Sequence, residues 1–449
     1  MRLFLVLVVV TAVTGKKLPE FFREKDGSIR VLCQREMSDD LKDSHDVSLI
    51  VANEDSQAAP VSLTKTDDGQ WKVVLNKVKT KHGGVLNYVL QYHKFNTLHQ
   101  LARSTEVFNL PELPPSQRFL QRRATVVFFD DFSSGKVDPS KWQHAITGDG
   151  GGNHGFSMYT PEAANSYVKD GVLYIHPTLT VDRFGANFLS NGNLDVKAIW
   201  GSCTDNARSG CHLQGHSIPP IMSAKLSSTQ HIRYGKIEVV AKLPKGDWLW
   251  PAIWMMPTEK HYGGWPASGE IDIMEARGNL HYHSPEGWTM GADVDYSTVH
   301  YGPAWNNKKS FGSPYTLRGT TFADAYHTFW IDWTQNYIKI GVDDHTSIAH
   351  NTPAAGYWHE GQFSGTNIWA SGGKDAPFDR PFYLILSLGV GGAWFNHANT
   401  NQPYAQPWSD GGSDTAMRTA FWDARHLWQA TWHGDDVAMK VRSVKMTQY

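Results

Sequence analysis

Short runs of alternating apolar and polar residues, separated by turn residues, dominate the second part of the chain. A period of two predicts β-strands, because successive side chains of a strand point to opposite faces. The runs are ATVVFFDDF, GVLYIHPTL, RYGKIEVVAKL, WPAIWMMP, EIDIME, TFWIDWTQNYIKIGVD, PFYLILSLGVGG and AMKVRSVKMTQY. Helical periodicity is scarce, although SDTAMRTAFWDARHLW predicts a short helix with Ser413 or Asp414 near its cap. Strands without alternating helices predict an all-β sandwich or barrel.

Two segments interrupt the strand pattern and divide the chain. Residues 1–15, MRLFLVLVVVTAVTG, have a positive charge, an apolar run and small residues, which are typical of a cleaved secretory signal peptide. We therefore expect a secreted, extracellular protein, and the apolar run is too short to span a membrane. Residues 109–124 are Pro-rich and then basic, as in a linker. They separate a small β-rich domain, residues 16–108, with the runs DVSLIVAN, QWKVVLN and GGVLNYVLQYHKF, from a large domain, residues 125–449.

Composition narrows the class of partner. The 449 residues are 41% hydrophobic and 19% charged, as in a soluble globular protein. A net charge of −2 gives no electrostatic case for nucleic acid or an anionic membrane as the main partner. Separately, we expect the protein to be a monomer. The chain is rich in aromatic residues, with 18 Trp, 17 Tyr and 20 Phe. Most of them belong in the core, but flat aromatic faces also suit sugar rings.

The chain has three cysteines, Cys33, Cys203 and Cys211. In an oxidising compartment, the stretch CTDNARSGC predicts a small-loop disulfide between Cys203 and Cys211. Cys33 is then left over, either buried as a small hydrophobe or available for an intermolecular bridge.

The stretch GEIDIMEARGN presents a problem of spacing. It reads as a strand, yet it carries three carboxylates, Glu270, Asp272 and Glu275. Glu270 and Asp272 share a face, whereas Glu275 lies an odd number of residues further on and should face the other way. A β-bulge around Ile273–Met274 would absorb the extra residue and return Glu275 to the face of the other two. We predict such a bulge, with all three acids on one concave surface.

Carboxylates on one face suit cleavage of a glycosidic bond. One carboxylate acts as nucleophile and a second protonates the leaving oxygen. Neighbouring like charges raise a carboxyl pKa, which would help to keep Glu275 protonated as the acid. Two alternatives stay open, a solvated acidic face and a hard-cation site for calcium. Aromatic neighbours favour a sugar groove, since Trp248, Trp250, Trp254 and Trp265 all precede the acidic strand.

These residues resemble a known family. KLPKGDWLWPAIWMMP, WPASGEIDIMEARGN, STVHYGP and LGVGG resemble glycoside hydrolase family 16, in particular its animal β-1,3-glucanases and the related β-1,3-glucan recognition (Gram-negative bacteria-binding) proteins. The resemblance covers residues 125–449. It implies a concanavalin A-like jelly-roll β-sandwich with a cleft, and retaining hydrolysis of β-1,3-glucan. We expect no cofactor and no catalytic metal, and structural calcium stays open.

The resemblance also implies roles for individual residues. Glu270 matches the nucleophile, Asp272 the assisting acid and Glu275 the acid/base. The substrate-binding positions are matched by Trp265, Trp250, Trp254, His300 and Asn153. Some positions depart from the family pattern, and these departures bear on substrate contacts rather than on the chemistry. They are Gly155, Ser157, Val240 and Ser387.

Two function classes compete. The first is a secreted retaining endo-β-1,3-glucanase, similar to a laminarinase. The second is a non-catalytic or weakly catalytic β-1,3-glucan recognition protein of innate immunity, a class that commonly lacks one or both catalytic Glu residues. The complete set of three acids favours the enzyme. Transglycosylation is a third option, and residues 16–108 faintly resemble a glucan-binding module of the recognition proteins.

Overall fold

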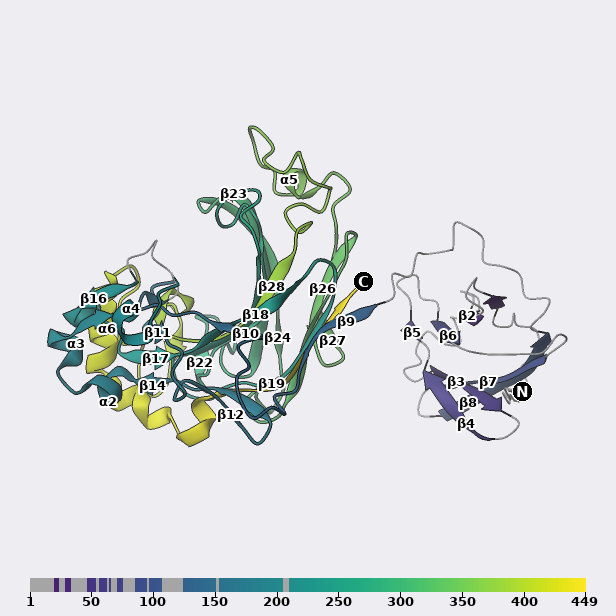
Figure 1. Cartoon of the computed structure of the whole chain (residues 1–449), viewed down its shortest axis with the longest axis horizontal. Coiled ribbons are helices and arrows are strands. Elements are labelled where there is room, and N and C mark those ends of the chain that lie inside the picture. The colour runs from purple at the N-terminus through teal and green to yellow at the C-terminus, as the bar shows by residue number, and fades with distance from the viewer. Residues whose placement is uncertain are drawn as a thin grey trace. The chain divides into compact units, whose positions relative to one another are not determined.

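The chain divides into two compact units, Met1–Leu120 and Gln121–Tyr449 (Figure 1). The computed structural model describes residues 124–150, 153–204 and 210–449, and before residue 124 it describes only the backbone of strands. In the residues that it describes, we find no helix that is both long and apolar enough to cross a membrane.

The first unit contains two four-stranded antiparallel sheets, in the orders β1-β2-β6-β5 and β4-β3-β7-β8. The strands are β1 (Glu20–Arg23), β2 (Ile29–Cys33), β3 (Val47–Asn53), β4 (Ser56–Ser62), β5 (Thr64–Lys65), β6 (Trp71–Leu75), β7 (Val85–Lys94) and β8 (Thr97–Glu106). Strands β3, β6 and β7 fall within the runs DVSLIVAN, QWKVVLN and GGVLNYVLQYHKF. The signal peptide, most of the linker and the side chain of Cys33 fall outside the described residues, and the role of residues 16–108 stays a prediction.

The second unit is a sandwich of two large antiparallel sheets. The seven-stranded sheet has the order β10 (Trp142–His144), β18 (Lys225–Ile232), β28 (Phe382–Val390), β20 (Leu249–Pro257), β21 (Glu270–Ala276), β23 (Val294–Ala304) and β24 (Asn307–Thr316). The eight-stranded sheet has the order β12 (Ser166–Lys169), β13 (Val172–Ile175), β30 (Met439–Gln448), β19 (Gly235–Lys242), β25 (His327–Trp333), β26 (Tyr337–Val342) and β27 (His345–Asn351), with β9 (Thr125–Asp130) beside β30.

One hydrophobic core fills the space between the two sheets. In β19, burial alternates residue by residue, so that Ile237 and Val239 point inward while Lys236 and Glu238 point outward. Ile253 of β20 and Ile271 of β21 enter the same core from the seven-stranded sheet. Each such side chain contributes about 1.5–3 kcal/mol when it is fully removed from water. The predicted all-β jelly-roll sandwich is therefore confirmed for this unit.

A smaller lobe of short strands and helices lies at one end of the sandwich (Figure 1). Its strands are β11 (Ser157–Tyr159), β14 (Thr178–Leu179), β15 (Asn193–Asp195), β16 (His212–Gln214) and β17 (Ile221–Ser223). Its helices are α2 (Thr180–Phe184), α3 (Phe188–Asn191), α4 (Val196–Trp200) and α6 (Asp414–Asp423). The remaining short elements are α5 (Tyr357–Glu360), α7 (Arg425–Trp428), β22 (Tyr282–His283) and β29 (Thr400–Asn401).

Two sequence predictions differ in detail from these elements. The run GVLYIHPTL was expected to form one strand, but it forms β13 and the two-residue β14, because Pro177 between them lacks the N–H that a sheet ladder requires. The predicted helix begins as expected, since the Ser413 side chain caps α6 by accepting a hydrogen bond from the Ala416 N–H at 3.3 Å. The helix then breaks at Ala424, and α7 follows it.

The predicted disulfide is confirmed. Cys203 and Cys211 are bonded, with 5.8 Å between their Cα atoms. Thr204 lies inside the loop that they close and is anchored to the neighbouring chain segment, since its N–H donates to the Ile146 carbonyl at 2.9 Å. The Ile146 N–H donates in turn to the Thr204 hydroxyl oxygen at 2.9 Å.

Candidate active site

The strand β21 contains the bulge that the carboxylate spacing predicts. Against β23, Asp272 pairs with Thr298 and Glu275 pairs with Tyr296, so Ile273–Met274 together oppose one residue, Ser297. The Ser297 hydroxyl donates a hydrogen bond to the Ile273 carbonyl at 3.1 Å. This bond gives a partner to a backbone carbonyl at the point where the ladder is irregular. Ile273 and Met274 are completely buried. As a result, Glu270, Asp272 and Glu275 all line the same cavity.

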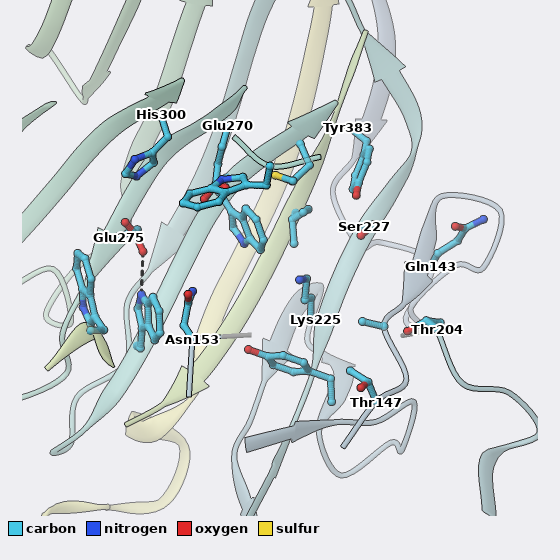
Figure 2. Close-up of a pocket in the computed structure, with 18 of the residues that line it drawn as sticks. Gln143, Thr147, Asn153, Thr204, Lys225, Ser227, Glu270, Glu275, His300 and Tyr383 are labelled. Atoms are coloured by element: carbon cyan, nitrogen blue, oxygen red, sulfur yellow. Dashed lines mark hydrogen bonds between the residues drawn. The ribbon is translucent and has the colours of Figure 1, made fainter. Parts of the chain in front are cut away.

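Glu270 and Glu275 also line a larger cleft of about 760 Å³ on the face of the seven-stranded sheet. Figure 2 shows Glu270, Glu275 and His300 at one end of this cleft, and Gln143 and Thr204 at the other. The cleft crosses the strands, since its lining comes from β24 through β21 to β18 and β10. The lining includes every substrate-binding residue that the family resemblance implies, namely Asn153, Trp250, Trp254, Trp265 and His300.

An indole N–H holds Glu275. The Trp250 Nε1 donates to Glu275 Oε1 at 3.0 Å, which is the dashed bond in Figure 2. The Trp250 ring is itself stacked on Trp394, with ring centroids 5.4 Å apart and planes inclined by 6°. Trp394 belongs to a short 3-10 helix, Gly392–Trp394, that follows β28. The orientation of Glu275 therefore depends on two aromatic side chains from other elements.

A histidine and a second tryptophan surround Glu270 and Asp272. His300 Nε2 lies 3.3 Å from Asp272 Oδ2, and its register partner across β21 and β23 is Glu270. The Trp265 ring lies 6.2 Å from the His300 ring and is 39% exposed, so its face is open to a ligand. The Lys308 ammonium lies 4.7 Å from the centre of the Trp265 ring, which is a cation–π distance.

Burial controls the protonation of the three acids. It raises the pKa of Glu270 to about 8, and the charge of Asp272 adds to this shift, whereas His300 and a hydrogen bond from Trp265 oppose it. Burial also raises the pKa of Asp272 and of Glu275; at Glu275 the charges of Asp272 and Glu270 raise it further, and the Trp250 hydrogen bond opposes them. Burial lowers the pKa of His300. The cluster therefore keeps protons near neutral pH, and those protons are shared among the three carboxyls.

This arrangement suits a reaction that needs both an ionised and a protonated carboxyl. Like charges at short range oppose simultaneous ionisation, so ionisation of one acid favours protonation of the others. Glu275 is the best placed to remain protonated, since it lies under the influence of both other acids. Glu270 has His300 and Trp265 beside it, and both favour its anionic form. The geometry thus supports a nucleophile at Glu270 and a proton donor at Glu275.

The centre of the cleft is floored by aromatic side chains. Trp254 lies beside Trp250 in the lining, and its indole N–H donates to the Ser387 hydroxyl at 3.0 Å. Ser387, one of the departures from the family pattern, therefore orients an aromatic side chain. The Lys225 ammonium lies 4.5 Å from the centre of the Trp254 ring. This places a cation over the ring face that faces the cleft.

The wall that carries Asn153 requires two neighbouring glycines. The Asn153 carbonyl accepts a hydrogen bond from the Ala393 N–H at 2.9 Å. A Cβ on Gly392 would lie 2.6 Å from that carbonyl oxygen, and one on Gly391 would lie 2.1 Å from the Phe156 ring. Both glycines also have positive φ, of 82° and 64°. The sequence LGVGG is thus explained by the close approach of this wall to the end of β28.

The other departures from the family pattern have structural explanations. Gly155 lies against Gly150, whose carbonyl oxygen would be 2.6 Å from an added Cβ, so a larger residue does not fit. Ser157 is fully buried in β11. Val240 lies on β19, in the eight-stranded sheet, which does not line the cleft. The residues at these three positions therefore do not take a side chain away from the floor of the cleft.

Within the described ranges, one group of side chains is close enough to share a metal ion. Its ligand atoms, on Glu270, Asp272 and His300, lie within 4.8 Å of one another. All three already interact in the acid cluster, and a cation bound there would displace the protons that the cluster retains. We therefore assign no metal to this site. Calcium elsewhere stays an expectation.

Several residues that line the cleft were not predicted from the sequence. They are Gln143, His144, Tyr159, Thr204, Lys225, Ser227, Lys308, Tyr383 and Trp394. Trp394 had a usable signal, because an aromatic residue four positions after Val390 follows a glycine turn at the end of a buried strand. Thr204 lies in the disulfide loop, and the others lie on strands that come together only in the folded sheets, so no local pattern marks them.

The chain is similar to several known proteins. The profile of Glycosyl hydrolases family 16 matches residues 194–406. The chain is 40% identical over 342 residues to the Beta-1,3-glucan-binding protein of Penaeus monodon, covering 72% of this chain and 89% of that protein. It is 33% identical over 276 residues to Glucan endo-1,3-beta-glucosidase A1 of Niallia circulans, covering 60% of this chain and 34% of that protein. The solved laminarinase of Rhodothermus marinus is 25% identical with a TM-score of 0.46, covering 72% of this chain and 97% of that one.

Proposed function

The chain belongs to glycosyl hydrolase family 16, and from that membership we propose that it is a retaining endo-β-1,3-glucanase. The observation that carries the proposal is the bulged strand β21, which brings Glu270, Asp272 and Glu275 to one face of an open cleft. A protein that only bound glucan would not need this cluster of one buried and two half-buried acids, because crowding and burial of carboxyls oppose folding.

The mechanism follows from the two environments of the glutamates. A Glu270 carboxylate oxygen attacks the anomeric carbon while Glu275 gives its proton to the departing glycosidic oxygen, which leaves a covalent glycosyl–enzyme ester. Glu275, now ionised, takes a proton from water as that water attacks the same carbon. The Glu270 ester bond breaks, Glu275 is protonated again, and the product keeps its original anomeric configuration. Asp272 exchanges a proton or hydrogen bond with Glu270 throughout.

β-1,3-Glucan as the substrate is supported by the names of two relatives and by the cleft itself. The relatives of Penaeus monodon and Niallia circulans are named for binding β-1,3-glucan and for cleaving it. In this chain, Trp250, Trp254 and Trp265 offer apolar faces along the same cleft as the acids. Such faces suit the C–H surfaces of pyranose rings.

The test is hydrolysis of laminarin by the full chain. We expect reducing ends to appear, and proton NMR to show the β-anomer before mutarotation. Glu270→Gln, which keeps the size and polarity of the side chain, should abolish turnover. If the wild type releases no reducing ends, or if Glu270→Gln retains most of the activity, the proposal is wrong.

One observation favours a second candidate, a recognition protein with little turnover. The relative at 40% identity is named a β-1,3-glucan-binding protein. Affinity electrophoresis in laminarin separates the two candidates. Retardation of the wild type without any release of reducing ends would favour recognition. Products longer than the starting oligosaccharide would indicate transglycosylation.

Secretion and targeting are further parts of the proposal. Residues 1–15 would direct export, in keeping with the Cys203–Cys211 disulfide. Residues 16–108 would hold the enzyme on insoluble glucan. We expect the full chain to sediment with insoluble β-1,3-glucan more strongly than a variant that begins at Gln121. Equal sedimentation would remove the targeting role.

A further inference from the structure

A buried guanidinium lies two residues after Glu275. Arg277 is 5% exposed and is surrounded by aromatic rings. Its Cζ atom lies 4.2 Å from the ring centre of Trp394, 5.2 Å from that of Tyr296 and 5.5 Å from that of Tyr282. The ring of Phe395 completes the cage at 5.7 Å. Contacts of this kind are strongest when the cation is removed from water, as it is here.

Arg277 holds Trp394 in two ways. Its Nη2 donates to the Trp394 carbonyl at 2.8 Å, and its guanidinium lies over the indole ring of the same residue. Trp394 is stacked in turn on Trp250, and Trp250 donates the hydrogen bond to Glu275. A continuous series of contacts therefore runs from Arg277 through two indoles to Glu275.

Burying the guanidinium of Arg277 in this space carries a desolvation penalty. Its Nε and Nη1 find no hydrogen-bond partner among the described residues. Burial lowers the pKa of Arg277, against the opposing influence of Tyr296, Tyr282 and Glu275. An apolar side chain of similar length would pack here without that desolvation penalty. The charge and the planar shape of the guanidinium therefore call for an explanation other than packing.

We propose that Arg277 is a positioning residue for Glu275. It fixes the ring of Trp394, Trp394 fixes Trp250, and the Trp250 N–H holds the Glu275 carboxyl toward the leaving-group oxygen. The inference rests on the proposed function, because it assigns a role in protonating a leaving group. Arg277 itself touches no substrate in this account.

Several other charged or titratable groups also face Glu275, and the effect of Arg277 has to be distinguished from theirs. They are Glu270 and Asp272 on β21 and Asp295, Tyr296 and His300 on β23. Lys225, Lys308 and Tyr383 line the same cleft. The variants below leave all of these in place.

The first experiment compares Arg277→Met with Arg277→Lys on two substrates. Met removes both the charge and the guanidinium, whereas Lys keeps the charge and loses the planar contact with Trp394. On laminarin, whose leaving group needs a proton, we expect kcat to fall about tenfold or more in both variants, a part of the roughly 10²–10⁴-fold that general acid catalysis supplies. On a nitrophenyl β-laminaribioside, which needs little protonation, we expect less than a threefold change. KM should change little on either substrate.

Arg418→Lys is the matched control. Arg418 is also buried, at 4% exposure, and its guanidinium donates to backbone carbonyls of Gly155 and Ser217. Its replacement should lower Tm but leave the ratio of the two substrate activities unchanged. If the Arg277 variants lose activity equally on both substrates, as a merely destabilised protein would, Arg277 is structural and the inference is overturned. If Arg277→Met does not fold, Trp250→Phe tests the same link, and an unchanged ratio there also overturns it.

A measurement that needs no turnover separates this inference from the proposed function. The pKa of Glu275 can be followed by carbon-13 NMR of labelled glutamate, with Glu275→Gln to assign the signal. Removal of Arg277 takes away a nearby cation and loosens the Trp250 hydrogen bond, so the pKa of Glu275 should rise in Arg277→Met. If the wild type is inactive but the pKa of Glu275 rises in Arg277→Met, the glucanase proposal is refuted and the positioning role of Arg277 stands. No rise would refute the positioning role, whether or not the wild type is active.

Discussion

Two strands of the same sandwich show how similar patterns lead to different chemistry. In β19, the outward Glu238 lies 2.8 Å from the Lys236 ammonium and 3.4 Å from that of Lys445. Burial opposes its ionisation, but the two lysines prevail and lower the pKa of Glu238. In β21, Glu270 also points out of the core, yet it has acids and a histidine around it, and burial raises its pKa to about 8.

The comparison shows that alternation determines which way a side chain points and its neighbours determine what it does. Glu238 sits on a solvated face with cations and forms surface ion pairs, which contribute about 0–1 kcal/mol each. Glu270 is half-buried in a cleft lined by aromatic rings. A carboxyl in the second environment keeps a proton that the first environment removes. Changes at these positions should therefore have opposite consequences.

The largest effect expected is on turnover. Glu270→Gln should reduce laminarin hydrolysis by more than about 10⁴-fold, in line with nucleophile removal in other enzymes. Glu238→Gln makes the same chemical change on the other sheet and should leave kcat/KM unchanged. Initial rates of reducing-end release measure both. Comparable losses in the two variants would mean that the glutamine change acts on folding rather than on chemistry.

The next effect is selective for the leaving group. Glu275→Gln removes the proton donor, so hydrolysis of laminarin should fall by roughly 10²–10⁴-fold. An activated nitrophenyl glycoside should form the glycosyl–enzyme at close to the wild-type rate, because its leaving group departs without protonation. Burst kinetics on that substrate provide the measurement. An equal loss on both substrates would contradict the role of acid.

The third effect concerns stability against pH. The folded state raises the pKa of Glu270 from 4.5 to about 8, so it binds this proton more tightly than the unfolded state does. The stability from that proton is fully present below about pH 4.5 and is lost as the pH rises toward 8. Glutamine carries no titrating proton, so Glu270→Gln does not lose stability as the pH rises. We expect this variant to be more stable than wild type at pH 8 by about 1–3 kcal/mol. Urea titrations at pH 4.5 and 8 should show the gain only at the higher value.

The smallest expected effect is a loss of stability in Glu238→Gln, opposite in sign to the gain expected for Glu270→Gln. Glu238→Gln removes an anion whose pKa the fold lowers, so the stability it provides is present above the usual carboxyl pKa and fades as the pH falls below it. We expect a loss below about 1 kcal/mol at neutral pH, reduced further at high salt. A stabilisation by Glu238→Gln would contradict the distinction between the two strands.

Much of the site could be predicted because it depends on local geometry. The spacing of Glu270, Asp272 and Glu275 permits them on one face only if one residue bulges, so three positions and a backbone irregularity followed from a single stretch. Cys203 and Cys211 were predictable for the same reason, since a short loop and an oxidising compartment limit the pairing.

The rest of the site depends on which strands become neighbours. Lys225 on β18 and Lys308 on β24 reach the same cleft from strands near opposite ends of the sheet order β10-β18-β28-β20-β21-β23-β24. In that order β28 stands between β18 and β20, far from its place in the sequence, and periodicity along the chain does not reveal such a neighbour. Thr204 enters the cleft through the disulfide loop, which has no strand pattern. Arg277 would have been read as an ordinary exposed charge, because its cage comes from β22, β23 and the turn after β28.

The bulge in β21 makes the activity easy to lose and hard to regain. A single nucleotide change turns a glutamate codon into a glutamine codon, and at position 270 it would silence the chemistry while the cleft kept its shape. The bulge itself depends on the number of residues between Asp272 and Glu275, which no substitution alters. A lineage without the extra residue would need an insertion, a rarer event than a point mutation, to bring its acids into line. Silent descendants of an active glucanase that still hold glucan are therefore a more accessible evolutionary outcome than new glucanases arising from a plain strand.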